Sequence, residues 1–191
     1  MYVEYLFALD PVMRGIAGVM DSALGRSNSM AATDPVAGGL ATYLEQHIAE
    51  ERGHDAWVRS DLEELGVDPG SEEHRVPLPS VAALVGSQYF WVHHVHPVAV
   101  LGHLAVAEGH PPTAAMVQRL RAASGATTRA FRTLDEHAQL DPAHGDEVAA
   151  LLDSLPLTPA QERLVVVAAM SGAGLMARAL EEVVETVDQA G

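Results

Sequence analysis

The sequence contains no cysteine among its 191 residues. This absence excludes disulfides, zinc–thiolate sites, iron–sulfur clusters and thiol nucleophiles, and it leaves oxygen and imidazole groups as the available metal ligands. The chain is well supplied with both, because it has ten histidines and 26 acidic residues. If this protein binds a metal, the ligand set suits iron or manganese.

Lysine is also absent, so all eleven basic residues are arginines, and the net charge is -15. Such a chain is a poor partner for the phosphate backbone of nucleic acids or for anionic lipids. No run of apolar residues reaches membrane-spanning length, and the first residues, MYVEYLFALDPVM, contain acids where a signal peptide would have a basic segment. We therefore expect a soluble, cytoplasmic protein that binds neither nucleic acid nor membrane.

The alternation of polar and apolar residues that marks β-strands persists nowhere in the chain, whereas apolar residues recur in steps of three and four. With 48% hydrophobic residues the chain can bury one sizeable core. We predict an all-α bundle of about seven helices that forms a single domain over residues 1–191. The expected helices cover residues 2–24, 40–65, 80–97, 97–109, a short segment ending near Gly125, 127–155, and 159–188.

The predicted helix over residues 40–65 has an apolar face that polar residues interrupt in the middle. Steps of three and four place all of its members on one side of a helix. Each buried imidazole or carboxylate costs about 1–3 kcal/mol unless it is paired. A bound metal ion would explain why these residues stand where leucine is expected. The face consists of Leu40, Leu44, His47, Glu51, His54, Val58, Leu62 and Leu65.

A second face of the same kind lies in residues 127–155. A further acid, Glu108, extends the apolar stripe that begins at Leu101 and Leu104. The chain therefore has two histidine-and-acid patterns and one additional acid on otherwise apolar surfaces. The second face consists of Phe131, Leu134, His137, Asp141, His144, Val148, Leu151 and Leu155.

By position these residues form two candidate metal sites. Glu51, His54 and His137 make a site of two histidines and one carboxylate, an arrangement that suits non-haem Fe(II) with open positions for oxygen. Three carboxylates against two divalent ions would leave one positive charge for an anionic substrate or a species derived from dioxygen. The second site is richer in carboxylates and consists of Glu108, Asp141 and His144.

The alternative is that these histidines are core residues that are hydrogen-bonded to the acids without a metal. We favour the metal, because buried charge pairs seldom stabilise a protein more than apolar residues do. Three other histidines share a seven-residue spacing, but His103 lies about 140° around its helix from Glu108 at 100° per residue. We interpret those three as solvated or capping residues: His96, His103 and His110.

Three segments together resemble the haem-oxygenase-like diiron oxidases, which are often labelled iron-containing redox enzymes. They are HIAEERGHDAW followed by SDLEELG, then VGSQYFWVHHVHPVAVLGHLAVAEG, and finally FRTLDEHAQLDPAHGDE followed by LLDSLPLT. The most specific element is the His-x3-Asp-x2-His pattern at residues 137, 141 and 144. The resemblance implies that Glu108 completes the second metal site from a preceding helix, and that Glu51 and His54 serve the first.

The resemblance also implies the cofactors and the reaction. Two Fe2+ ions would activate dioxygen, as co-substrate, and oxidise a small molecule. The expected reactions are N-oxygenation, C–C cleavage or desaturation, often in natural-product biosynthesis, and an external electron donor could take part. The apolar last helix could also serve as a homodimer face.

Members of this family carry the first-site carboxylate either seven or three residues before the histidine. Here His47 occupies the former position and Glu51 the latter, so we choose Glu51 as the ligand. His47 is then an additional ligand, a hydrogen-bond donor to a ligand, or a core histidine. Glu50 and Asp55 are expected to face away, although Asp55 could orient a ligand.

Pro142 directly follows Asp141 and disfavours a continuous helix at the predicted ligand. Either one helix ends there and Asp141 caps the next, or the helix is loosely formed until metal orders it. The substrate pocket is expected near residues 89–91, Phe131 and residues 170–176. Three arginines could hold a substrate carboxylate or could simply be surface residues: Arg129, Arg132 and Arg178.

Two other classes of protein remain open. One is a metal-free protein of the same fold, such as a thiaminase II-like or quinone-cofactor-synthase-like enzyme or a ligand-binding protein. The other is a ferritin-like carboxylate iron protein, which also uses Glu-x-x-His on bundle helices. In the ferritin-like arrangement His137 would have no role.

Overall fold

The computed structural model describes residues 1–68, 71 and 75–190, and His74, expected on the surface, lies outside them. The described residues contain helices and no strand, which confirms the all-α prediction. The α-helices are α1 (Tyr2–Met30), α2 (Pro35–Glu51), α3 (Asp55–Glu64), α4 (Pro79–His94), α5 (Val100–Ala107), α6 (Ala114–Ser124), α7 (Arg132–Ser154) and α8 (Pro159–Ala190), and two short 3-10 helices are η2 (Pro97–Ala99) and η3 (Thr128–Phe131).

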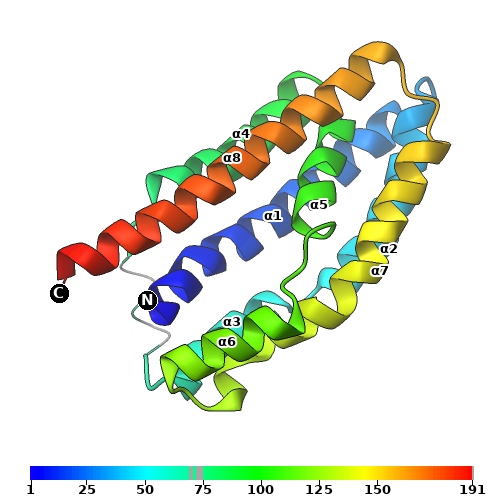
Figure 1. The fold of residues 1–191 in the computed structure, drawn as a ribbon. Helices are drawn as coiled ribbons and strands as arrows, with labels where there is room; N and C mark the ends of the chain where they lie inside the picture. The colour runs from blue at the N-terminus through cyan, green and yellow to red at the C-terminus, as the bar shows by residue number, and fades with distance from the viewer. Residues whose placement is uncertain (69–70, 72–74, 191) are drawn as a thin grey trace.

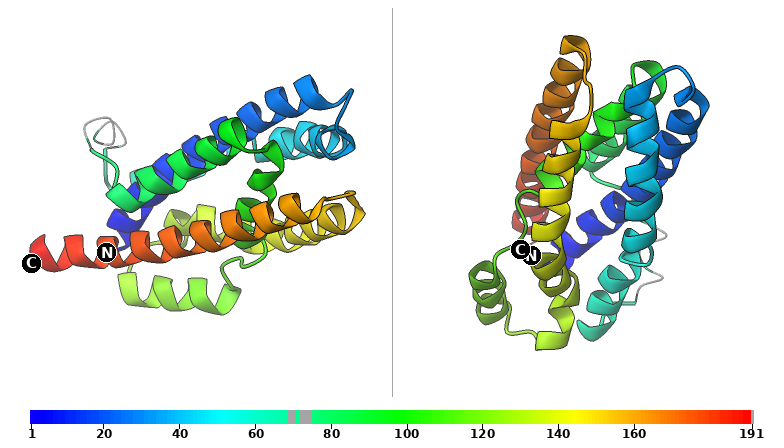
Figure 2. Two further views of the ribbon diagram at one scale, coloured as in Figure 1. Left: turned by 90° about the horizontal axis from the view of Figure 1, so that it is seen from above. Right: turned by 90° about the vertical axis from the view of Figure 1, so that its right-hand side faces the viewer.

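The long helices form two layers (Figures 1 and 2). α1, α2 and α4 make one layer, and α7 and α8 make the other, as the left view of Figure 2 shows. The short helix α5 runs between the layers and packs against α8, α7 and α4. The largest apolar cluster fills the space around it and includes Val19, Leu40, Leu101, Val148 and Ala168. This arrangement places the end of α5 between α2 and α7.

The predicted helix over residues 40–65 is two helices, and the prediction of one continuous helix is wrong. α2 ends at Glu51, and α3 begins at Asp55 after a turn in which Gly53 has φ 94°. This left-handed conformation suits glycine and ends an α-helix. The predicted face is nevertheless directed inward on both sides of the break, because Leu44, His47 and Val58 are buried.

α7 continues through Pro142, as the predicted helix over residues 127–155 requires, so of the two alternatives at Asp141 the one in which a helix ends there and another begins is wrong. A proline inside a helix costs about 3 kcal/mol. Apolar residues on the same face, Leu134 before the proline and Val148 after it, are both buried. Their burial on both sides offsets the cost and keeps the two halves of α7 in one helix.

Other boundaries differ by a few residues. α1 extends six residues beyond the predicted end and passes through Pro11. α2 begins five residues earlier than predicted, because Pro35 suits the first helical position and the Asp34 side chain accepts hydrogen bonds from the N–H groups of Val36 and Ala37. The predicted helix over residues 97–109 is η2 followed by the shorter α5.

α8 is long and apolar enough, by length and composition alone, to cross a membrane. The prediction that no stretch reaches that length is therefore wrong for Pro159–Gln189, where the most apolar window has a mean hydropathy of 1.5 and is 22% buried. Part of this surface is strongly exposed, including Val166 and Met170. The expected soluble, cytoplasmic location stays a prediction.

Candidate metal centre

Glu51, His54 and His137 come together although they belong to different elements. Glu51 is the last residue of α2, His54 precedes the first residue of α3, and His137 lies on α7. Each side chain offers one ligand atom within 4.8 Å of the others. The turn at Gly53 is what brings Glu51 and His54 to the same place after the helix breaks. We call these three residues the first group.

Hydrogen bonds orient the first group. His54 Nδ1 lies 2.9 Å from Glu51 Oε2, and His137 Nδ1 donates to the Thr133 carbonyl oxygen at 2.7 Å. The latter bond leaves His137 Nε2 as the available ligand atom. Burial raises the pKa of Glu51, but the hydrogen bond and charge of His54 outweigh it, and the pKa lies below its usual value. Burial lowers the pKa of His137, which favours the neutral, metal-binding imidazole.

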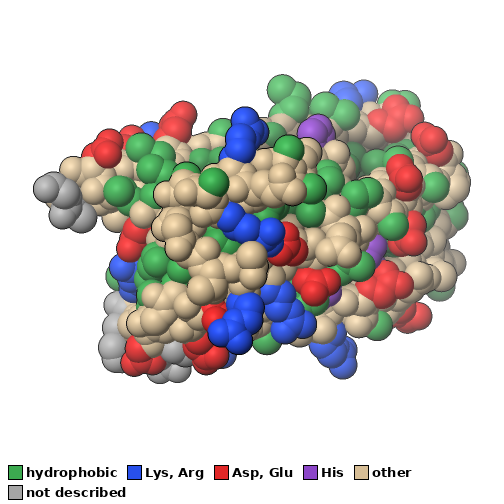
Figure 3. Space-filling view, turned by 60° about the horizontal axis from the view of Figure 1, so that its bottom comes forward, with side chains coloured by type: hydrophobic (Ala, Val, Ile, Leu, Met, Phe, Trp, Pro, Cys, Tyr) green, Lys and Arg blue, Asp and Glu red, His purple; other side chains and the backbone are tan. Residues whose placement is uncertain are grey.

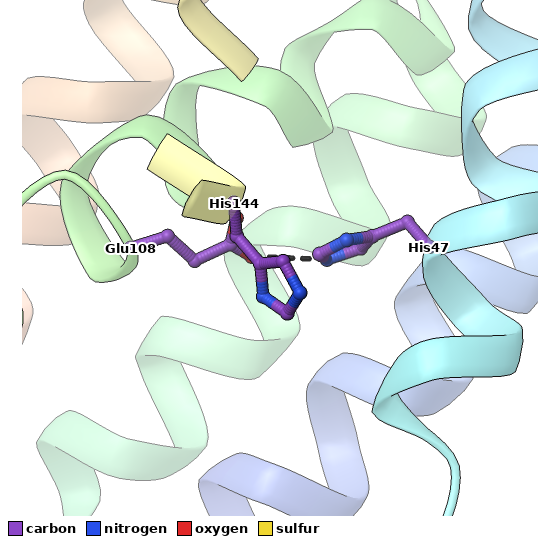
Figure 4. Close-up of side chains that lie close together, drawn as sticks. All are labelled: His47, Glu108 and His144. Atoms are coloured by element: carbon purple, nitrogen blue, oxygen red, sulfur yellow. Dashed lines mark ion pairs between the residues drawn. The ribbon is translucent and has the colours of Figure 1, made fainter. Parts of the chain in front are cut away.

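A second group consists of His47, Glu108 and His144 (Figure 4). The three side chains point toward one another from α2, the end of α5, and α7. His47 Nε2 lies 3.0 Å from Glu108 Oε1, and the rings of His47 and His144 are 5.0 Å apart between centroids. Their exposed fractions are 1%, 7% and 7%, so this group is more deeply buried than the first.

The second group depends on a close approach of α7 to the end of α5. Gly145, next to His144, makes this approach possible, because a Cβ atom there would lie 3.0 Å from the Glu108 carbonyl oxygen and 3.2 Å from the Gly109 Cα. A larger residue would push the two segments apart. Gly145, which directly follows the predicted motif, therefore has a packing role beside His144.

Asp141 is in neither group, although the sequence predicts it as a ligand. Its side chain is buried, with 5% exposed, and burial together with the negative charges of Glu108 and Glu51 raises its pKa to about 7. It therefore lies near the second group without contributing to its close cluster. Its assignment as a ligand stays a prediction, as do those of Glu51, His54, His137, Glu108 and His144.

His47 joins the second group, which agrees with its place among the candidate ligands. Glu50 is exposed, as expected, although its Oε2 also lies 3.7 Å from His144 Nε2. The break after Glu51 explains this, since Glu50 lies in the last turn of α2 and projects toward α7. His103 is buried with 2% exposed and is not solvated, because α8 packs over its side of α5.

Several residues with an expected pocket role have other surroundings. Phe131 is fully buried and stacks on Tyr2 with 4.3 Å between ring centroids, whereas Met170 is 71% exposed. On the face in Figure 3, arginines and acids lie side by side. The candidate substrate arginines pair with acids as follows: Arg129 with Glu64, Arg132 with Glu136, and Arg178 with Glu181, Glu182 and Glu185.

Sequence reasoning missed two aromatic neighbours of the groups. Tyr43 stacks on His47 with 5.1 Å between ring centroids, and Trp57 stacks on His54 at 3.8 Å. The signal was available in the spacing, because each aromatic stands three or four residues from its histidine. The Tyr43 hydroxyl is buried and has no hydrogen-bond partner among the described residues.

Hydrogen bonds among these residues satisfy only part of their polar atoms, and a bound metal would satisfy more of them. Two pairs, His54 with Glu51 and His47 with Glu108, satisfy part of the centre. However, Glu108 Oε2 and His47 Nδ1 are buried without a hydrogen-bond partner among the residues described, and His144 Nδ1 has only a 3.4 Å ion-pair contact with Glu51 Oε1. Unpaired buried polar atoms cost about 1–3 kcal/mol each. Oxygen and imidazole donors of this kind are ligands for Fe or Mn.

The fold shows to which structural class the protein belongs. The chain has the haem-oxygenase-like fold, because it aligns with a domain of unknown function with a heme oxygenase-like fold from Shewanella denitrificans. The alignment covers 98% of this chain and 80% of that one, with a TM-score of 0.81 and 20% sequence identity. It aligns over 96% of its length, with a TM-score of 0.77 and 16% identity, to 79% of a TenA homolog from Pseudomonas syringae pv. tomato. This fold confirms the predicted architecture.

The family follows from the sequence. The family described as iron-containing redox enzyme matches residues 27–177, which include every candidate ligand. The chain therefore belongs to this family, and the predicted resemblance is confirmed. No curated protein matches it significantly.

Proposed function

We propose that this protein is a non-haem diiron oxidase or oxygenase that uses dioxygen to oxidise a small molecule. The observation that carries the proposal is the position of Glu51 between the two groups. Its Oε2 lies 2.9 Å from His54 Nδ1, and its Oε1 lies 3.4 Å from His144 Nδ1. A carboxylate whose oxygens face two sets of histidines can serve two neighbouring cations, and the iron-containing redox family supports iron as the cation.

Under this proposal the first group holds one iron. Glu108 and His144 hold the second with Asp141, and His47 is a further ligand or a donor to one. Two ferrous ions at these positions would supply electrons to dioxygen. The chain positions the ions through buried ligands and limits the access of water. The carboxylates of Glu51, Glu108 and Asp141 leave one net positive charge against two divalent ions, which favours an anionic reactant.

The substrate is proposed to be a small molecule that undergoes N-oxygenation, C–C cleavage or desaturation, in a biosynthetic pathway. An external electron donor, a cytoplasmic location and a homodimer are part of the same proposal. The homodimer would use the exposed apolar residues of α8, among them Val166, Met170 and Leu180.

The proposal is tested by anaerobic titration of metal-free protein with Fe(II), followed by mixing with oxygenated buffer under stopped-flow absorbance. We expect uptake of about two irons and a transient visible absorbance band. His137→Ala and Glu108→Ala should each reduce the uptake and abolish the band. His103→Gln is the control, because His103 is a buried histidine, with 2% exposed, that lies in neither group. Uptake that is indifferent to both ligand substitutions would refute the diiron assignment.

A second candidate is a metal-free enzyme or ligand-binding protein of the same fold, such as a thiaminase II-like enzyme. The structural similarity to a TenA homolog favours it, and so does the His47–Glu108 pair, in which an imidazole nitrogen lies 3.0 Å from a carboxylate oxygen. Such a pair can exchange protons with a bound ligand. Once a substrate is known, activity that persists in chelator would support this candidate over the diiron oxidase.

A further inference from the structure

Asp61 is a fully buried acid, with 0% exposed, that belongs to neither metal group. It lies on α3, seven residues after His54, so the two residues are about two turns apart on one side of that segment. An ionised carboxylate in such a position must be paired with hydrogen-bond donors. The groups that donate hydrogen bonds to Asp61 therefore indicate its role.

Both donors are backbone groups at the start of α7. The N–H of Arg132 donates to Asp61 Oδ1, and the N–H of Thr133 donates to Asp61 Oδ2, each at 2.9 Å. The first N–H groups of a helix have no partner within the helix, and the residue before α7 is Phe131, whose side chain cannot cap it. Asp61 is therefore a helix cap supplied by a different helix, and its negative charge suits that end of α7.

The same short segment of α7 orients a candidate ligand. The backbone of Thr133 donates its N–H to Asp61 and accepts, through its carbonyl oxygen, the hydrogen of His137 Nδ1 at 2.7 Å. This second bond sets the tautomer of His137 and directs Nε2 away from the helix backbone. The rings of His137 and His54 are 5.4 Å apart between centroids.

We propose that Asp61 is the positioning residue of the first group. It fixes the start of α7 against α3, and through Thr133 it fixes the tautomer and direction of His137. His54 therefore lies at the beginning of α3, and two turns later Asp61 holds the segment of α7 that orients His137. The inference rests on the proposed function, since it assigns Asp61 the support of an iron-binding group.

The first test uses metal-free protein labelled with 15N-histidine. In wild type, NMR should show a His137 signal with the proton on Nδ1, which His137→Ala identifies by its loss. Asp61→Asn keeps the size of the side chain but turns an N–H donor toward a backbone N–H, so we expect the Nδ1–H signal to be lost or averaged. Asp10→Asn is the matched control, because Asp10 is also buried but lies on α1.

The second test is Fe(II) titration of the same variants. Removal of a residue that orients a metal ligand lowers metal affinity by about 10- to 100-fold. We expect this loss at the first group in Asp61→Asn and not at the second, with far-UV circular dichroism unchanged. If Asp61→Asn folds poorly, Asp61→Glu, which keeps both carboxylate oxygens, should restore the His137 signal.

Two results would overturn the inference. One is an unchanged His137 signal together with unchanged affinity of the first group. The other is equal weakening of both groups in proportion to lost helix content, which would make Asp61 a purely structural residue. If wild type binds no iron while the His137 signal still depends on Asp61, the proposed function fails and the positioning role stands.

Discussion

The two groups of the candidate centre differ in how contacts within the protein hold their side chains. In the first, hydrogen bonds fix the histidines, from His54 to Glu51 and from His137 to Thr133. In the second, burial is deeper and His47 pairs with Glu108, but Glu108 Oε2 and His47 Nδ1 have no hydrogen-bond partner within the described part of the chain. The first group is therefore prepared for a cation, whereas the second is destabilising until one binds.

This difference has a chemical consequence. A prepared site binds its cation without reorganisation, whereas the second site lies beside Pro142 in a helix that carries the cost of an internal proline. Filling the second site relieves unpaired polar atoms, so its occupancy and the stability of α7 are linked. We expect the first group to load first and the second to respond more strongly to its surroundings.

The largest expected effect comes from Glu51, the residue that faces both groups. Glu51→Ala should abolish binding of both irons. The loss of iron affinity should exceed about 100-fold, which is the largest loss that removal of a ligand-orienting residue causes. Anaerobic Fe(II) titration with measurement of bound iron checks this. Glu45→Ala is the control, because Glu45 is an exposed acid on the same helix. Retention of one tightly bound iron in Glu51→Ala would mean that Glu51 serves a single site.

The next prediction separates the groups. Glu108→Ala should leave about one iron, bound within a few-fold of the tighter site of wild type, because the first group keeps its hydrogen bonds. His137→Ala should also leave about one iron, but bound at least about 10-fold more weakly, because only the unprepared second group remains. Calorimetric titration of both variants measures the two constants. Equal constants would show that the hydrogen bonds confer no advantage.

The pH dependence of metal-free protein tests the cost of burying Asp141 beside the second group. Burial and the nearby acids raise the pKa of Asp141 from 3.8 to about 7. The folded state then holds a proton that the unfolded state releases, so the contribution of Asp141 to stability is fully present below about pH 4 and is lost as pH rises through about 7. The loss from this group is at most about 4 kcal/mol.

Urea unfolding of metal-free protein between pH 4 and 8 measures this loss. Asp141→Asn should remove it and should be more stable than wild type at pH 8, whereas Asp146→Asn, at an exposed position of α7, should behave as wild type does. The prediction fails if Asp141→Asn and wild type lose stability in parallel over this range.

The fold was predictable from helical periodicity because apolar faces identify helices regardless of what covers them. The single error in the number of helices, the break at Gly53, comes from one backbone conformation inside an unbroken apolar pattern. At Pro142 the sequence left a break and a continuous helix open, and burial of Leu134 and Val148 on either side decides for the continuous helix. Local rules thus fail where packing on both sides of a residue decides the outcome.

For the candidate centre, spacing within single helices identified the residues that the structure brings together. Spacing cannot show contacts between helices, and this is why it paired Asp141 with Glu108 where the structure has His47 at 3.0 Å. It also gave no role to Asp61, whose partners lie 71 and 72 residues away in the chain. Such cross-helix hydrogen bonds have no periodic signature in the sequence.

The smallest expected effect concerns Tyr43, which stacks on His47 of the second group and whose buried hydroxyl has no hydrogen-bond partner among the described residues. Removing an unpaired buried hydroxyl while keeping the ring should stabilise the metal-free protein by about 1 kcal/mol, or about 2–4 °C in Tm. Trp57→Phe, the corresponding change beside the first group, should instead destabilise it, since it shortens a ring that stacks on His54. Thermal unfolding of Tyr43→Phe and Trp57→Phe compares the two directly. Loss of stability in both variants would mean that the polar groups around the second group have hydrogen-bond partners, as those around the first group do. The difference between the two groups would then lie in their histidines alone.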